Sequence, residues 1–385
     1  MKVIVNTNVI LEDSVLFDGV VAIKDGIIQA VTKKDEFVIP PNAEVIDANG
    51  LFTAPGLIDI HNHGSINNFF VEDTRECCEY FIKHGQTSVY PTFYSTCTAQ
   101  EMIDGAKKLK DFSQTHELGQ MIKGIYMEGP YMMNVGSNQK YMKWGDEIKK
   151  ENYQSLIENL KGFAKVWAID PDRKGIEEFI QDVKEVDKKA IFSFGHSMAT
   201  AKRCEEIYPM GIKLQTHHGD SGQAPKINQA RCDAGCDEFT LCTKEMYAEI
   251  ICDQNCVHLG EYTIRLALMC KGREKIILIT DSYPTKTNYK NAEEKGVKFG
   301  PDLNYDEEGL LAGSHLTLDK AVRNVIKHTN CSVVDAIRFA SINPATLLGI
   351  EKDYGSIKEG KVADVILIDD EINVKKVFLK GKEII

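Results

Sequence analysis

Five short apolar segments of the sequence end in side chains that can bind a metal ion or carry a proton. These residues are His61 and His63 in "GLIDIHNH", Glu128 in "YMEGP", His196 in "FGHS", His217 in "THH" and Asp281 in "LITDS". Successive side chains of a β-strand point to opposite faces, so His61 and His63 point the same way. A lone histidine is more often structural than a ligand. Metal-binding residue types at the ends of five such segments instead favour a divalent metal held by imidazoles and carboxylates.

These side chains can meet only if the segments are neighbouring strands. Short apolar runs alternate with longer amphipathic stretches, and the runs predict strands at 56–63, 87–93, 122–129, 164–170, 190–196, 212–218, 248–253 and 275–281. We therefore predict an α/β fold, a TIM-like (β/α)8 barrel, which gathers the carboxyl ends of its strands at one face. A doubly wound open sheet is the alternative, but the sequence contains no G-x-G-x-x-G or P-loop motif to support it.

Amphipathic stretches between the strands predict the helices. They lie at 74–85, 99–112, 151–160, 175–189 and 332–345. The last is expected to start at Ser332 as its N-cap and to end before Pro344.

Both ends of the chain predict β-structure. Asp25 and Gly26 separate two apolar runs, and this dipeptide is a strong hairpin signal. Short strands are also expected near the C-terminus, two of them joined through Lys380 and Gly381. Neither end can close a core alone, so residues 1–53 and 350–385 are predicted to form one small β-sandwich domain beside a barrel of residues 54–349.

Composition excludes several classes of function. The net charge of −11 argues against a general nucleic-acid binder. The eleven cysteines include no C-x-x-C pair, which indicates reduced thiols in a cytoplasmic protein. The N-terminal residues lack the pattern of a signal peptide, and no apolar run approaches the ~20 residues of a membrane span. We expect a cytoplasmic enzyme with no membrane partner.

Several segments resemble the amidohydrolase superfamily and, within it, the N-acetylglucosamine-6-phosphate deacetylases. They follow the family's order: "APGLIDIHNHG", "YMEGPYM", "GHS", "THH", "VHLGEYTIR", "LITDS", "LAGSHLTLDKAVRN" and "GSIKEGKVADVILID". The resemblance implies that Glu128, His196 and His217 hold a primary metal. It also implies that His61 and His63 complete a second site, with Glu128 as the bridge. Zinc is the expected cation, with iron, cobalt or nickel as alternatives.

The resemblance also implies an activity. The expected reaction is hydrolysis of the N-acetyl amide of N-acetylglucosamine-6-phosphate or N-acetylgalactosamine-6-phosphate. Asp281 would take a proton from the attacking water and pass it to the departing amine. His258 aligns with a family histidine that contacts substrate near the scissile carbonyl, and His218 is either a support for the site or incidental. The resemblance further implies a homodimer.

The sequence departs from the family in the segments that read the substrate. Asp220 and Ser221 replace a family Asn-Ala pair, Asn138 lies where the family has a Gly-Ala/Thr-His element, and His315 replaces a small pocket residue. The family's Arg-Glu-Pro-Gly turn, whose arginine reaches the phosphate, is missing. These four residues are therefore candidate substrate contacts.

The departures leave other functions open. A related deacylase, cyclic amidase or deaminase with a different, unphosphorylated substrate is one alternative. Glu128 in the bridging place disfavours cyclic amidases that use a carboxylated lysine there. A non-enzymatic scaffold on a decayed barrel is the other alternative, and it predicts losses among the ligand residues that the sequence does not show.

Overall fold

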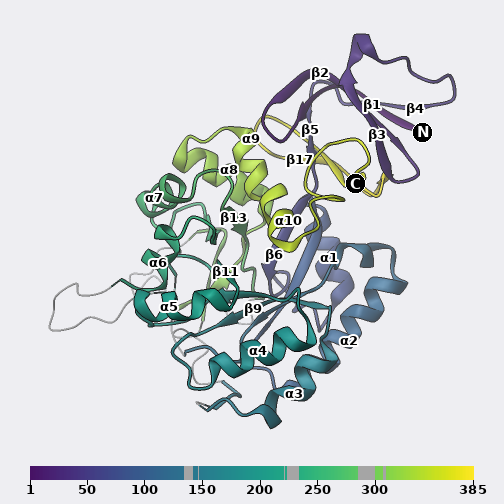
Figure 1. The fold of residues 1–385 in the computed structure, drawn as a ribbon. Coiled ribbons are helices and arrows are strands. Elements are labelled where there is room, and N and C mark those ends of the chain that lie inside the picture. Colours follow the sequence, from purple (N-terminus) through teal and green to yellow (C-terminus); the bar gives the residue numbers. More distant parts are fainter. Residues whose placement is uncertain (134–141, 146, 221, 223–233, 285–299, 307–308) are drawn as a thin grey trace. The chain divides into compact units, whose positions relative to one another are not determined.

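The computed structural model describes residues 1–133, 142–145, 147–220, 222, 234–284, 300–306 and 309–385. Two eight-stranded sheets and one two-stranded sheet make up its β-structure. One eight-stranded sheet forms the barrel and the other is built from both ends of the chain (Figure 1).

The barrel strands follow one another in chain order around the sheet. They are β6 (Leu57–Asn62), β7 (Gln86–Tyr94), β8 (Ile125–Glu128), β9 (Ala164–Ile169), β10 (Ile191–Phe194), β11 (Ile212–Gln215), β12 (Tyr247–Ile251) and β13 (Ile276–Ile279). All of the predicted strands are confirmed. Most are buried along their whole length, as expected for strands covered on both faces. The Asp281 amide donates to the His61 carbonyl at 3.0 Å and the His63 amide to the Ser282 carbonyl at 2.9 Å, which joins the first and last strands.

In chain order α1 to α7 lie between the barrel strands, and α8 to α10 follow the last of them (Figure 1). They are α1 (Thr74–Ile82), α2 (Ala99–Thr115), α3 (Lys150–Asn159), α4 (Ile176–Val186), α5 (Ala201–Ile207), α6 (Cys236–Cys242), α7 (Glu261–Lys271), α8 (Leu318–Thr329), α9 (Val333–Phe339) and α10 (Ile342–Leu348). A short hairpin of β14 (Leu303–Tyr305) and β15 (Leu311–Ser314) follows β13. The first four helices confirm the predicted segments.

The prediction of one helix that starts at Ser332 and ends before Pro344 is wrong, because the segment forms two helices and Pro344 lies in the second. Ser332 does cap α9, its hydroxyl accepting the Asp335 amide at 3.1 Å. The break has a cause in Pro344, whose ring would clash with the carbonyl of Ala340 in a continuous helix. That carbonyl instead accepts the amide of Ile58 at 2.8 Å, and Pro344 lies in the first turn of α10, where a missing amide proton costs nothing.

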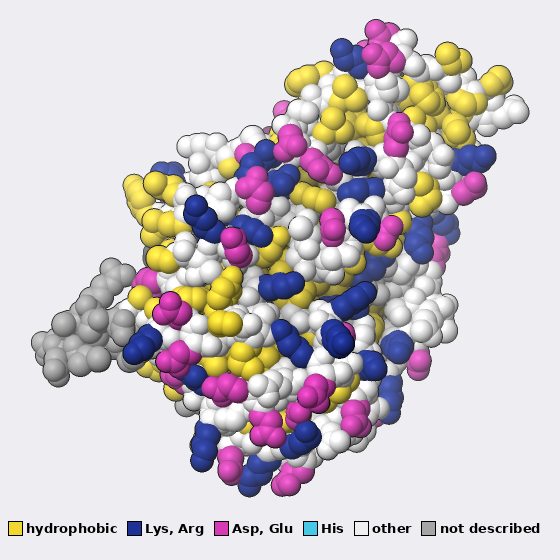
Figure 2. Space-filling view, viewed as in Figure 1, with side chains coloured by type: hydrophobic (Ala, Val, Ile, Leu, Met, Phe, Trp, Pro, Cys, Tyr) yellow, Lys and Arg dark blue, Asp and Glu magenta, His cyan; other side chains and the backbone are white. Residues whose placement is uncertain are grey.

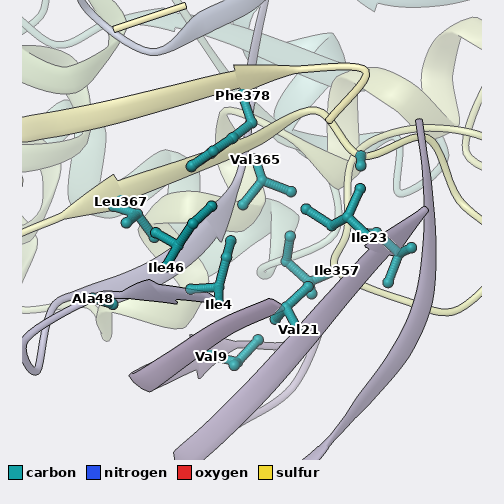
Figure 3. Close-up of a cluster of buried hydrophobic side chains, with 12 residues drawn as sticks. Ile4, Val9, Val21, Ile23, Ile46, Ala48, Ile357, Val365, Leu367 and Phe378 are labelled. Carbon is teal, nitrogen blue, oxygen red and sulfur yellow. The ribbon is translucent and has the colours of Figure 1, made fainter. Parts of the chain in front are cut away.

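The terminal sheet contains strands from both ends of the chain. Its strands are β1 (Lys2–Ile10), β2 (Val15–Lys24), β3 (Ile27–Lys33), β4 (Glu44–Asp47), β5 (Phe52–Pro55), β16 (Val365–Ile368), β17 (Val374–Leu379) and β18 (Lys382–Glu383). Both predicted turns are confirmed: Asp25 and Gly26 join β2 to β3, and Lys380 and Gly381 join β17 to β18, all with positive φ. Strands of the two termini face each other across a hydrophobic cluster that includes Ile4 and Phe378 (Figure 3).

The chain divides into two compact units. One comprises residues 1–59, 79–88 and 317–385, and the other residues 60–78 and 89–316. The domain boundaries predicted from the sequence, at 53/54 and 349/350, stay a prediction. On the face shown in Figure 2, the described basic and acidic side chains are interspersed, without a continuous patch of one sign.

Candidate metal centre

The candidate residues lie at the carboxyl ends of the strands that were predicted to carry them. His61 lies in β6 and Glu128 is the last residue of β8, while His196, His217 and Asp281 each follow their strand by two residues. These last three adopt positive φ values of 46°, 25° and 47°. Such backbone costs about 1–3 kcal/mol for a non-glycine residue and is typical of functional sites.

Glu128 is the centre of the cluster, and its two carboxylate oxygens face different histidines. Oε1 lies 2.8 Å from His196 Nε2 and 3.1 Å from His217 Nε2. Oε2 lies 3.1 Å from His63 Nε2 and 3.6 Å from His61 Nε2. One carboxylate thus connects two pairs of imidazoles.

Asp281 joins the pair formed by His61 and His63. Its Oδ1 lies 3.5 Å from His61 Nε2 and 3.2 Å from His63 Nε2. The potential ligand atoms therefore form two groups, one of His61, His63, Glu128 and Asp281 and one of Glu128, His196 and His217, each with all its atoms within 4.8 Å of one another. The sequence predicts Asp281 as the proton-transferring group, and its carboxylate lies beside the potential ligand atoms of His61 and His63.

A buried glutamate that the sequence analysis missed supports both groups. Glu249 lies in β12 with no exposed surface. Its Oε2 accepts a hydrogen bond from His61 Nδ1 at 3.2 Å and from the His217 backbone amide at 3.1 Å. The available signal was one charged residue within an apolar strand, "YAEII", which by itself names no partner.

Further contacts hold the rings of His217 and His61 in place. His217 Nδ1 donates to the Asp220 carbonyl at 2.8 Å, so its Nε2 faces Glu128. The His61 ring stacks on Tyr126 with centroids 4.5 Å apart. His218 does not belong to either ligand group, and its Nδ1 lies 3.1 Å from Gln215 Oε1.

The electrostatics of the cluster keep its carboxylates ionised. Burial alone would raise the pKa of Glu128, but the charges and hydrogen bonds of His61, His196 and His217 hold that pKa well below its usual value. Burial likewise opposes ionisation of Asp281, yet His61 and His63 lower its pKa. Conversely, burial would lower the pKa of His217, but Glu128 raises it to about 10. The site therefore has a strong affinity for positive charge, which protons supply when no cation is bound.

His258 is held apart from the ligand groups by a second buried carboxylate, Asp253. Asp253 Oδ2 lies 3.2 Å from His258 Nδ1, and the carbonyl of Gly313 lies 3.1 Å from Nε2. Both partners are acceptors, so both ring nitrogens carry protons. In agreement, Asp253 raises the pKa of His258 against the opposing effect of burial. The sequence analysis singled out His258 but not Asp253.

Gly313 also brings the β15 segment against the turn that carries Asp281. The Ser314 amide donates to the Asp281 carbonyl at 2.8 Å. At Gly313, with φ of +60°, a Cβ atom would lie 2.6 Å from that same carbonyl oxygen. A side chain there would therefore displace the turn.

The other predicted substrate contacts are only partly described. Ser221 and Asn138 lie outside the described residues. Asp220 directly contacts the cluster through its carbonyl, while the backbone of His315 is bonded to the Asp302 carbonyl at 2.9 Å. Both side chains are partly exposed.

The donor set fits a divalent cation. Neutral imidazole nitrogens and carboxylate oxygens are the ligands of zinc and of other first-row divalent metals. Here these donors converge from several strands, all of them buried, and none of the described cysteines is within either group. Buried, converging charges of this kind are stable when a metal or opposite charges compensate them. The arrangement supports a divalent metal.

Comparison with known proteins agrees with this geometry. Residues 52–384 match the Amidohydrolase family. The chain belongs to the amidohydrolase family. The family match shows a hydrolase acting on carbon–nitrogen bonds, and the clustered potential ligands support a metal-dependent reaction.

Named relatives span nearly the whole chain. An N-acetylgalactosamine-6-phosphate deacetylase of Escherichia coli O157:H7 is 26% identical, covering 96% of each chain. An N-acetylglucosamine-6-phosphate deacetylase of Bacillus subtilis is 25% identical, covering 97% of this amidohydrolase and 94% of the relative. Among solved structures, the N-acetylglucosamine-6-phosphate deacetylase of Pasteurella multocida has a TM-score of 0.85 at 23% identity, covering 99% of both chains. That likeness shows the fold.

No helix among the described residues of this amidohydrolase has the length and apolar character of a membrane span.

Proposed function

We propose that this amidohydrolase removes the acetyl group from N-acetylglucosamine-6-phosphate or N-acetylgalactosamine-6-phosphate. The products are acetate and the amino-sugar phosphate. The main support for the proposal is the presence of two groups of potential ligands that share Glu128. The two relatives named above, which this chain matches over 96% and 94% of their length, bear the names of these two deacetylases.

The proposed metal ligands are His61, His63, Glu128, His196 and His217. Because the oxygens of Glu128 face different histidine pairs, the arrangement supports two ions with Glu128 between them. Zinc is the expected metal, and iron, cobalt and nickel accept the same ligands. A bound divalent cation would polarise the amide carbonyl and lower the pKa of a water molecule toward about 7.

Asp281 is the proposed general base and acid. Its depressed pKa keeps the carboxylate ionised and ready to accept a proton from the attacking water. The same carboxylate then gives that proton to the amide nitrogen as the carbon–nitrogen bond breaks, so that a neutral amine leaves. The proposal is supported by the position of its Oδ1, which lies 3.5 Å from His61 Nε2 and 3.2 Å from His63 Nε2.

His258 is the proposed contact for the scissile carbonyl. Its Nε2 proton, which the Gly313 carbonyl accepts in this structure, would turn to an oxygen of the substrate that becomes negative during the reaction, while Asp253 keeps Nδ1 protonated. Asp220, Ser221, Asn138 and His315 are the proposed contacts for the sugar. A homodimer and a cytoplasmic location stay predictions from the sequence.

The test is an amine-release assay with zinc-loaded protein. The substrates are N-acetylglucosamine and N-acetylgalactosamine, each with and without the 6-phosphate. We expect release of acetate and amine from at least one phosphorylated sugar, at a kcat/KM well above that of its unphosphorylated form. Preference for an unphosphorylated sugar would reject the phosphate part of the proposal. Ammonia as the product would identify a deaminase instead.

A further inference from the structure

Strand β12 supplies none of the proposed metal ligands, yet it carries a fully buried carboxylate. Glu249 has no exposed surface and lies opposite Ile277 of β13 in the sheet. A buried carboxylate is costly unless hydrogen bonds or opposite charges compensate it. The hydrogen-bond partners of Glu249 therefore indicate its role.

The first bond goes to a ligand of the group that contains Asp281. Glu249 Oε2 accepts from His61 Nδ1 at 3.2 Å, which fixes the proton on Nδ1 and leaves Nε2 directed at Glu128 and Asp281. A carboxylate behind a ligating imidazole makes the imidazole more basic and holds its ring orientation.

The second bond goes to a ligand of the other group. The same oxygen accepts the backbone amide of His217 at 3.1 Å. His217 has a positive φ of 25°, a conformation that a non-glycine residue keeps only when its surroundings hold it there. Glu249 also accepts the amide of His218 through its own carbonyl at 2.8 Å, so both amides of this turn are bonded to one residue.

We propose that Glu249 is a positioning residue that aligns one ligand in each of the two groups, His61 by its ring and His217 by its backbone. One oxygen of one side chain thus couples the geometry of both groups. The inference rests on the proposed metal site, and it adds a residue that touches neither the cation nor the substrate.

The test compares Glu249→Gln and Glu249→Ala with wild-type protein. Zn²⁺ is titrated into metal-depleted protein against a competing chelator, and the visible absorption spectrum is recorded after Co²⁺ loading. We expect Glu249→Ala to raise the Kd for Zn²⁺ by about 10- to 100-fold and to alter the Co²⁺ spectrum. Glu249→Gln keeps an acceptor oxygen for His61 Nδ1, so it should recover part of the affinity.

Asp253→Asn is the matched control. Asp253 is equally buried and lies just after the same strand, but it holds His258, which belongs to neither ligand group. This variant should bind Zn²⁺ with wild-type affinity. Thermal unfolding of all metal-depleted variants separates a general loss of stability from a specific loss of metal binding.

Each outcome decides the inference. Zn²⁺ affinity within about threefold of wild type in the Glu249 variants would overturn it. So would an equal loss of affinity in Asp253→Asn. If Glu249→Ala does not fold, the affinity of Glu249→Gln is decisive, because the amide has nearly the same shape as the carboxylate. Failure of wild-type protein to bind Zn²⁺ would reject the proposed function itself, which is a different result from unchanged affinity in the variants.

Discussion

The metal centre and the core of the terminal sheet are both buried, but they are built from opposite kinds of side chain. The terminal core is a cluster of twelve hydrophobic residues, among them Ile4, Val21 and Phe378 (Figure 3). The metal centre consists of buried imidazoles and carboxylates. The hydrophobic effect that orders the first is non-directional, whereas each group of the second is fixed by directional contacts.

Because the two regions are built from different side chains, we expect them to control different properties of the protein. Changes in the terminal core should alter the free energy of unfolding and leave metal binding unchanged. Changes in the metal centre should alter metal affinity, turnover and pH dependence.

Asp281→Asn should reduce turnover by about 10²- to 10⁴-fold, because the amide cannot accept the proton of the attacking water. Glu128, His196 and His217 are unchanged in this variant, so metal should remain bound in that group. Amine release and elemental analysis measure the two quantities on the same sample. Turnover close to wild type would remove Asp281 as the base.

Phe378→Ala should lower the free energy of unfolding by about 3–5 kcal/mol, because it leaves a cavity in the terminal core. Phe378 has no exposed surface and belongs to the hydrophobic cluster of the terminal sheet. Urea denaturation of metal-depleted protein measures the loss. The Kd for Zn²⁺ of the folded protein should not change, and a large change would show that the two regions are not energetically separate.

Zinc affinity should rise with pH by about tenfold per unit for each proton that the metal displaces. Without metal, the pKa of His217 is raised to about 10. The stabilising effect of its proton is therefore complete below the ordinary pKa of about 6.5 and is lost as the pH rises through about 10. At any pH below about 10, Zn²⁺ must therefore displace this proton from the folded protein. Chelator competition over this range measures the slope, and a flat profile would contradict the raised pKa.

The same pH series offers a contrast with the terminal core. The difference in unfolding free energy between wild type and Phe378→Ala should stay constant across it, since no ionisable side chain belongs to that cluster. A strong pH dependence of this difference would show that the stability of the terminal core also depends on titrating groups.

Ser332→Ala should cost about 1 kcal/mol of unfolding free energy through loss of the α9 cap, the smallest effect predicted. Ser332→Thr, which keeps a hydroxyl at the cap, is the matched control. Both variants should retain wild-type turnover. Equal stability of Ser332→Ala and wild type in urea denaturation would show that the cap contributes nothing.

Much of this architecture was predictable because its signals are local in sequence. Alternating apolar runs located the barrel strands, and Asp25–Gly26 marked a turn that needs positive φ. The sequence predicted that the candidate ligand residues lie together, because the strands of a parallel barrel bring their carboxyl ends to one face, and the structure clusters these side chains. The break in the helix at 332–345 was missed because the role of Pro344 depends on where the preceding helix ends. The carbonyl of Ala340, freed by that break, bonds to Ile58, a contact between residues far apart in the chain.

Glu249 and Asp253 could not be assigned from sequence for a related reason. A single acidic residue in or after an apolar strand has no partner until the fold supplies one. The structure supplies His61 and His217 for Glu249 and His258 for Asp253. The ligand residues form a pattern along the chain, whereas the residues that orient them are recognised only by contact.

Anomalous diffraction from crystals of the zinc-loaded protein tests the central claim most directly. That claim is that Glu128 lies between two groups of ligands that hold divalent metal. We expect an anomalous peak at ~2.0–2.2 Å from a carboxylate oxygen of Glu128 and from the Nε2 atoms of His196 and His217. At full loading it predicts a second peak between Glu128 and the pair His61 and His63. Zinc bound elsewhere, with none beside Glu128, would contradict the account.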